Sequence, residues 1–432
     1  MSNSNREALV QSKPNRSQQN KCRDKIPTEY PDLDASLKPL GTSSNLKVVL
    51  SNANLEIAVN SMNTEIELFE NGILVDKSQD HKRSRLLDEC YKAGFKKTLI
   101  DDHLIALAES NKYHPFADYL KGDSWDGIGR IDQLIEAMNA KNRPLAHSVM
   151  KKFFIAVVAA VYQPNFSSKL IPVIQGDQSF RKTAFIRRFA NMLDGAFLEG
   201  QELNPDQKDS VLSCIKSMIV ELGELERTSR NSQGGLKAFF TKSIDSVRPP
   251  YGQKDIKKPR QTLFIATVNG TDFFRDETGS SRYAVIELAE RVDMDRVNDI
   301  LGWDYDNGRL TLIEPYRLKQ FWLEAYQLYK AGESWELSED ELAMAAEANK
   351  SHDFKSSYYE ILRDKFIDVD MDNRSFENMT ATAVCEYANI PTSNVRAVGK
   401  ALKRLVTEGL LESKPGRSNK TLYKMPTISC FS

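Results

Sequence analysis

A possible phosphate-binding loop lies between an apolar run at residues 171–175 and a helix-like stretch that follows it. Its residues are Gly176, Asp177, Gln178, Ser179, Phe180, Arg181, Lys182 and Thr183. In a Walker A motif, backbone N–H groups at a helix N-terminus bind phosphates, a lysine reaches the β and γ oxygens, and a hydroxyl holds Mg²⁺. Lys182 and Thr183 match the last two roles. Arg181 replaces the second glycine and lacks its conformational freedom, so a plain strand-to-helix turn is the alternative.

Two carboxylates end the next apolar run, at Glu221 and Glu224. In a Walker B strand, one acid binds Mg²⁺ and a second orients or deprotonates the attacking water. We assign the metal to Glu221 and the water to Glu224, and the reverse assignment stays open. Acids solvated at a strand end are the alternative interpretation.

A third apolar run, residues 262–268, ends at Asn269. The amide of this residue is suited to contact the γ-phosphate and the attacking water, as a sensor residue does. The carboxyl ends of parallel strands meet at one edge of an open α/β sheet, where such folds bind ligands. The three runs therefore predict one site for ATP and Mg²⁺.

The elements that must position this site divide the chain into five parts. Strand-like runs alternate with helical stretches in residues 146–330, which predicts an α/β P-loop ATPase core of the AAA+-like, superfamily 3 helicase-like kind. Residues 46–145 show apolar spacings of three and four that predict a helical N-terminal domain. Residues 1–45 are rich in Ser, Asn, Gln and Pro, which is typical of a disordered tail. Residues 331–375 are expected to form a helical linker, and residues 376–432 a winged-helix domain.

The composition of the 432 residues excludes several classes of protein. The 59 Lys and Arg residues nearly cancel the 60 Asp and Glu residues, so only local charge can indicate a polyanionic partner. The five cysteines lack metal-ligand spacing, which argues against zinc and against a disulfide framework. No run resembles a membrane span or a signal peptide, so we expect no membrane contact and a cytoplasmic location.

The C-terminal residues carry a local positive charge. A short helix, a turn, a longer helix and two short strands around a Pro-Gly-Arg-Ser-Asn turn are typical of a winged helix. Residues 391–432 hold eight Lys and Arg residues against two Glu residues. This excess favours binding to duplex DNA, with protein docking as the alternative. The residues expected to contact DNA are Arg396, Lys400, Lys403, Arg404 and Arg417.

The chain resembles the virulence-associated protein E family of phages, satellites and genomic islands, which is related to superfamily 3 helicases and primase-helicases. The resemblance covers about residues 115–290. Its motifs are Trp125-Asp126-Gly127 with Arg130, residues 220–225, Arg248-Pro249-Pro250-Tyr251, Thr267-Val268-Asn269, and the segment from Phe274 to Tyr283. The resemblance implies an ATPase core assembled as a hexamer around DNA during replication of a mobile element. Arg181 departs from the glycine usual in this family.

A ring of identical subunits would place ATP between neighbours, where an arginine from one subunit can neutralise charge on the phosphoryl group bound by the other. Arg282 is the first candidate and Arg275 the second, with surface ion pairs as the alternative. Superfamily 3 helicases hold DNA on projecting elements in their channel. The basic segment at residues 242–260 suits such an element, with backbone contacts to single-stranded DNA expected from Arg248, Lys254, Lys257, Lys258 and Arg260.

These inferences lead to one main hypothesis and two rivals. The main one is an ATP-driven DNA helicase or replication initiator of a phage, satellite or genomic island. The first rival is a DNA-binding regulatory or phage-interference protein with a degenerate, weakly active nucleotide site. The second, a primase-helicase, is disfavoured because residues 1–145 show neither zinc ligands nor a clear acidic triad, so priming or loading would require a separate protein.

Overall fold

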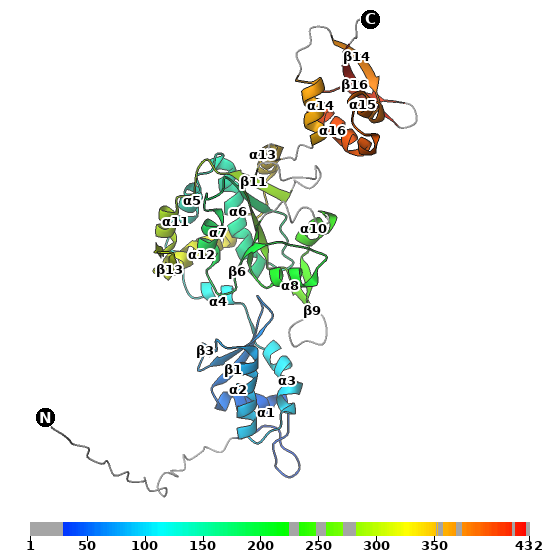
Figure 1. Cartoon of the computed structure of the whole chain (residues 1–432). Helices are drawn as coiled ribbons and strands as arrows, with labels where there is room; N and C mark the ends of the chain where they lie inside the picture. Colours follow the sequence, from blue (N-terminus) through cyan, green and yellow to red (C-terminus); the bar gives the residue numbers. More distant parts are fainter. Residues whose placement is uncertain are drawn as a thin grey trace, which may run out of the picture. The chain divides into compact units, whose positions relative to one another are not determined.

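The structure is a computed structural model that describes residues 29–223, 233–247, 256–270, 282–350, 352, 357–368, 374–416 and 420–428. Glu224, Arg248, Lys254, Arg275 and Arg417 lie outside the described residues. The chain divides into two compact units, Met1–Tyr113 and His114–Ser432. Figure 1 gives the labels of their helices and strands.

The first unit is a mixed α/β structure rather than the helical domain expected for residues 46–145. Its sheet has the order β3-β2-β1-β4, with β1 at Leu55–Asn60, β2 at Ile66–Glu70, β3 at Ile73–Leu74 and β4 at Lys112–Tyr113. Helices α1 (Ser43–Asn52), α2 (Gln79–Lys92) and α3 (Thr98–Glu109) complete it. The strands have six residues or fewer, so the longer helical periodicity around them dominated the sequence pattern.

Residues 29–45 also belong to this unit, whereas the sequence predicted a disordered tail up to residue 45. The buried Asn45 side chain donates to the carbonyl oxygens of Asp32 and Leu40 and accepts from the Asp32 N–H group. One polar side chain thus fixes a segment that has few apolar residues of its own. The predicted tail over residues 1–28 lies outside the described residues.

The second unit contains the parallel sheet expected for the core. Its order is β11-β5-β10-β7-β6. The strands are β5 (Ile171–Gln175), β6 (Phe197–Gln201), β7 (Ile219–Gly223), β10 (Leu263–Val268) and β11 (Tyr283–Glu287), and every pairing between neighbours is parallel. All residues of β5 and β10 are buried, which explains why these strands read as continuous apolar runs.

Helices cover this sheet in two groups (Figure 1). Helices α8 (Lys208–Ile215) and α10 (Gln233–Phe240) share one apolar cluster with strand residues such as Val173 and Phe264. Helices α6 (Arg143–Tyr162), α7 (Lys182–Ala190) and α12 (Pro315–Lys330) meet in a second cluster, where Phe154 packs edge-to-face on Phe189 and Phe321. Helices α4 (Pro115–Leu120), α5 (Arg130–Glu136) and α11 (Met294–Leu301) and the hairpin of β12 (Trp303–Asp306) and β13 (Arg309–Leu312) complete this part.

By length and composition, helix α6 could cross a membrane. The sequence analysis had found no such segment. Of the most apolar window of α6, 67% is buried inside the protein. Because α6 packs against α12, this apolar character serves the core, as in the central helix of many folded domains.

The expected linker at residues 331–375 is not a separate element. Helix α13 (Glu339–Lys350) packs against β11, where the Asn349 amide donates to the Tyr283 carbonyl and accepts from the Val285 N–H group. Helix α14 (Ser357–Phe366) instead shares an apolar cluster with the C-terminal elements. Those elements are α15 (Ala381–Tyr387), α16 (Val395–Thr407) and an antiparallel sheet of order β14-β16-β15, formed by Arg374–Met379, Thr421–Ile428 and Ser413–Pro415.

Candidate active site

The loop at residues 176–181 joins β5 to α7. A Cβ atom at Gly176 would lie 2.8 Å from the Phe180 ring and 3.3 Å from Leu288, so only glycine fits there. Arg181 has φ 64° and ψ 27°, a left-handed conformation that costs a residue with a Cβ atom about 1–2 kcal/mol. The loop therefore adopts the conformation for which glycine would be the natural residue, with arginine in its place.

Lys182 is the first residue of α7, and its side chain folds back over this loop. Its Nζ donates to the carbonyl oxygens of Gly176 (2.7 Å) and Asp177 (2.9 Å) and to Asn269 Oδ1 (2.8 Å). Only 7% of the residue is exposed, and this burial lowers the pKa of the ammonium group. The hydrogen bond between Lys182 and Asn269 joins two residues that are 87 positions apart in the sequence, and the sequence analysis assigned both to one site.

Thr183 and Glu221 meet beside this lysine. The Thr183 hydroxyl donates to Glu221 Oε1 at 2.5 Å, and the Thr267 hydroxyl donates to the same oxygen at 2.9 Å. Glu221 is 1% exposed, burial raises the pKa of its carboxyl, and its Oε2 has no partner among the described residues. A buried carboxylate oxygen without a described partner, close to the Thr183 hydroxyl, is a donor set suited to a hard cation.

These residues fit Mg²⁺ better than a transition metal. Among the described residues, no group of three or more His, Cys, Asp and Glu side chains could hold a metal alone. Mg²⁺ is usually bound by one or two carboxylates together with substrate phosphates and water. Thr183 and Glu221 match that pattern. The sequence analysis named Thr267 only as part of a family motif and gave it no role, although its place two residues before Asn269 is the spacing of side chains on one face of an extended chain.

The connections of the sheet diverge at this place. Strands β5 and β10 are neighbours, yet the chain leaves β5 towards β6 at one edge of the sheet and leaves β10 towards β11 at the other. In open α/β sheets, ligands bind outside the carboxyl ends of the strands where such connections diverge. Lys182 and Asn269 are hydrogen-bonded to each other at this position.

Arg282 lies at the opposite end of the sheet. It directly precedes β11, whose first residue, Tyr283, pairs with Ile171, the first residue of β5. The loop at 176–181 follows the last residue of β5, so roughly 17 Å of strand separates the two positions. Arg282 therefore cannot reach the candidate site of its own chain.

Two of the cations expected to contact DNA are instead buried in the core. Arg260 forms a two-point ion pair with Asp245, at 2.6 Å for each contact, and its guanidinium lies over the Phe239 ring. Lys258 Nζ donates to the Ile215 carbonyl at 2.5 Å, and burial lowers its pKa to about 8. Both predictions were wrong because charge in a sequence does not reveal a buried partner. Lys257, directly before Lys258, is exposed.

The ion pair between Arg260 and Asp245 holds a β-hairpin in place beside the sheet. Strands β8 (Ile244–Val247) and β9 (Ile256–Pro259) are antiparallel, with Asp245 opposite Lys258. Asp245, Lys258 and Arg260 are each no more than 6% exposed, so the base of this hairpin belongs to the core.

The basic residues of α16 divide into two kinds. Arg396, Lys400 and Lys403 are exposed, as contact with DNA requires. Arg404 is 13% exposed, donates to Glu408 at 2.9 Å and packs on the Tyr359 ring, so its place in the predicted DNA contact was wrong. Its charge is already matched by Glu408 within the C-terminal elements.

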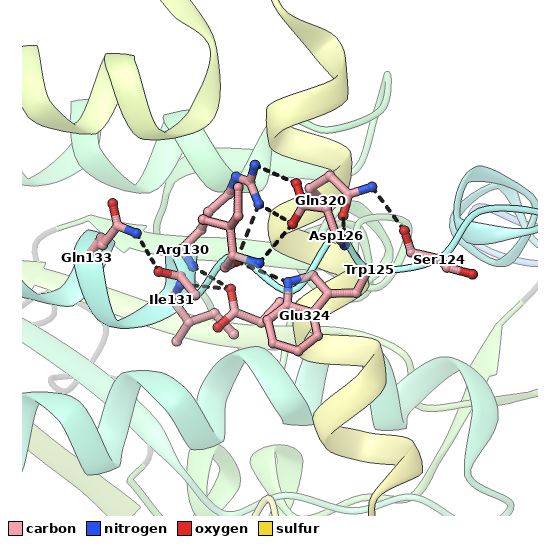
Figure 2. Close-up of polar contacts among 10 residues, drawn as sticks. Ser124, Trp125, Asp126, Arg130, Ile131, Gln133, Gln320 and Glu324 are labelled. Atoms are coloured by element: carbon pink, nitrogen blue, oxygen red, sulfur yellow. Dashed lines mark hydrogen bonds and ion pairs between the residues drawn. The ribbon is translucent and has the colours of Figure 1, made fainter.

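The Trp125-Asp126-Gly127 motif forms a network that joins its loop to α12 (Figure 2). Asp126 binds both terminal nitrogens of Arg130 at 2.8 Å, and its N–H group donates to Gln320. Glu324 Oε2 accepts from the N–H groups of Arg130 and Ile131 at 2.6 and 3.0 Å, which caps the start of α5. Burial raises the pKa of the Glu324 carboxyl. The motif thus attaches its loop to helix α12 within this unit.

A comparison with known protein families identifies the family to which this chain belongs. The Virulence-associated protein E-like domain matches residues 120–354, more than half of the chain, and the protein is a member of that family. This confirms the resemblance found in the sequence. No curated protein matches the chain.

Solved structures of the NrS-1 C-terminal region resemble the chain at low identity. The A-form apo structure has 12% sequence identity and a TM-score of 0.43, covering 88% of this chain and 99% of its own. A second apo structure of that region has 12% identity and a TM-score of 0.42, with coverage of 88% and 98%.

Proposed function

We propose that the protein is a P-loop ATPase that acts on DNA as a ring of identical subunits, as a helicase or replication initiator of a phage, satellite or genomic island. The observation that carries the proposal is the meeting of Lys182, Thr183, Glu221 and Asn269 at the carboxyl edge of one parallel sheet. They come from three segments, the start of α7, the strand β7 and the residue after β10, and each has the chemistry that triphosphate or Mg²⁺ requires. In this proposal the family membership supplies the link to mobile elements.

The bonds of Lys182 indicate how the site would accept ATP. Its ammonium now binds two loop carbonyls and the Asn269 amide, which hold it above the loop. Phosphate oxygens would replace the carbonyl oxygens as acceptors, because charge-assisted bonds to phosphate are stronger than bonds to neutral carbonyls. Asn269 would keep the lysine in place and contact the γ-phosphate.

Thr183 and Glu221 would hold the Mg²⁺ ion, which supplies neutralisation of the phosphate charge when it is bound. Binding the ion at Glu221 Oε2 would satisfy the buried oxygen that lacks a partner among the described residues. It would also keep the carboxyl ionised despite its burial. Glu224, three residues further on, is proposed to orient the attacking water.

The position of Arg282 supports a site completed by a neighbouring subunit. Since Arg282 lies at the amino end of its own sheet, it can contribute only to a triphosphate bound by another copy. A ring of copies, with six as the expected number, would supply such a contact to every site. Arg275 stays the second candidate for this role.

DNA contact is proposed for two surfaces. The β8–β9 hairpin, fixed at its base by Arg260 and Asp245, would present Lys257 with Arg248 and Lys254 to a single strand. The C-terminal elements from α14 to β16 are proposed to be a winged helix that binds duplex DNA through exposed residues of α16. A separate primase or loader would supply priming, and the protein would act in the cytoplasm.

A second candidate function is a DNA-binding regulator with a weak nucleotide site. The observation that favours it is Arg181, which holds the loop in a left-handed conformation without glycine. This strain would be released by any rearrangement of the loop, and the lysine already has acceptors within the protein.

ATP hydrolysis with and without single-stranded DNA distinguishes the two functions. Lys182→Ala and Glu224→Gln should each lower DNA-stimulated turnover by on the order of 10²-fold. Lys208→Ala is the matched control, because Lys208 is also the first residue of a helix and is exposed. Wild-type turnover no higher than that of Lys182→Ala, under conditions where DNA still binds, would favour the regulator.

A further inference from the structure

A pocket of about 430 Å³ lies at the amino-terminal end of the sheet. Its walls come from the residues before β5, the start of β11 and helix α13. Its volume is within the usual range of small-molecule sites, and its lining is mainly apolar. Since β5 separates it from the loop at 176–181, it is distinct from the proposed nucleotide site.

One nitrogen of a charged side chain that lines this pocket has no partner among the described residues. Arg282 lines it, and its buried Nε atom has no hydrogen-bond acceptor among the described residues. A buried donor of a charged group is costly to leave unsatisfied. The other charged lining residues are Lys169 and Glu336, so two cations face one acid and the balance favours an anion.

The walls are held in place by bonds of their own. Trp335 Nε1 donates to the Ser167 carbonyl at 3.2 Å, and its ring packs 5.9 Å from that of Phe166. On the other side, Asn349 is fixed by its two bonds to the backbone of β11. A ligand would therefore enter a cavity that already has its shape, which lowers the entropic cost of binding.

We propose that this pocket binds a small organic carboxylate, with its acid group paired to Arg282 and its apolar body against Trp335 and the alanines of α13. A guanidinium prefers a planar, two-oxygen acceptor, which a carboxylate supplies. The apolar lining excludes a fully polar anion such as free phosphate as the preferred ligand.

Binding of 4-phenylbutyrate and of the uncharged 4-phenylbutanol, measured by ligand-observed NMR on the full chain without nucleotide, tests the proposal. Phenylbutyrate should bind the wild type about tenfold or more tightly than the alcohol, and Arg282→Gln should remove that difference. Ala345→Trp should block both probes by filling the pocket, while Arg309→Gln is a matched control on an exposed strand. Thermal unfolding of each variant verifies that it is folded.

Three outcomes would overturn the site: equal affinity of the wild type for both probes, unchanged phenylbutyrate binding by Arg282→Gln, or retained binding by Ala345→Trp. If Arg282→Gln does not fold, the two probes on the wild type and on Ala345→Trp still decide. A consequence rests on the proposed function, since a carboxylate on Arg282 would withdraw it from the neighbour's triphosphate. Phenylbutyrate should then inhibit wild-type ATPase but not Ala345→Trp. Binding without inhibition would support the pocket and count only against the role of Arg282 in hydrolysis.

Discussion

Replacing Arg181 with glycine should stabilise the protein, which is the reverse of what most substitutions do. Arg181 has φ 64°, and relief of this conformation is worth about 1–2 kcal/mol. Glycine gives back roughly 0.5–1 kcal/mol, because it makes the unfolded chain more flexible. The side chain is exposed and makes no described hydrogen bond, so little contact is lost. The net gain should be about 0.5–1 kcal/mol, or a rise in Tm of about 1–4 °C for a domain of this size.

Differential scanning calorimetry of Arg181→Gly beside Arg187→Gly provides the measurement. Arg187 lies within α7, the helix that follows Arg181, where glycine costs about 1 kcal/mol and also removes the ion pair with Glu199, so the Tm of this variant should fall. Under the proposed function, Arg181→Gly should also raise the affinity for ATP, because the loop no longer needs a strained residue. If the two variants lost stability equally, the left-handed conformation of Arg181 would be refuted, and with it the strain that favours the regulator.

Three further predictions concern individual charged residues. Glu221→Gln should raise the free energy of urea unfolding at about pH 8 but not at about pH 4. Burial raises the folded pKa of this carboxyl above the usual 4.5, so its ionisation costs stability only as pH rises. A gain of equal size at both pH values would contradict this prediction. Asp245→Ala should lower that free energy by about 3–5 kcal/mol, since it leaves Arg260 buried without its partner, and a change near zero would mean that Arg260 reaches water. Lys403→Ala should weaken duplex DNA binding, measured by fluorescence anisotropy, and reduce the slope of log affinity against log salt concentration by roughly 0.9. Arg404→Ala should mainly destabilise the C-terminal elements. The opposite pattern would restore Arg404 as a DNA contact.

The candidate nucleotide site was predictable from the sequence because its geometry follows from topology. Lys182 begins the helix after β5, Glu221 lies within β7, and Asn269 directly follows β10, and parallel strands bring such positions to one edge. The sequence could not show that Thr183 and Glu221 would share a direct bond, since that depends on how α7 packs over β7. It could have identified Thr267, which shares the face of Asn269.

The basic segment shows where sequence reasoning fails. Lys257 and Lys258 are neighbours of identical type, yet one is exposed and the other is buried on the Ile215 carbonyl. Alternation along β9 separates them, and nothing in the composition reveals which face of a short hairpin packs inward. Asp245 and Arg260 stand 15 residues apart, so their pairing appears only when the hairpin is folded.

The two bonds of Asn349 to β11 have a consequence for how copies of this protein can associate. An amide side chain that binds the Tyr283 carbonyl and the Val285 N–H group occupies backbone positions where an added strand would pair. The outer edge of β11 is thereby closed at these positions to sheet extension and to the aggregation that open edges invite. Copies that meet at this edge must do so through side chains. Such contacts can form and break repeatedly without breaking the hydrogen bonds between the strands of the sheet.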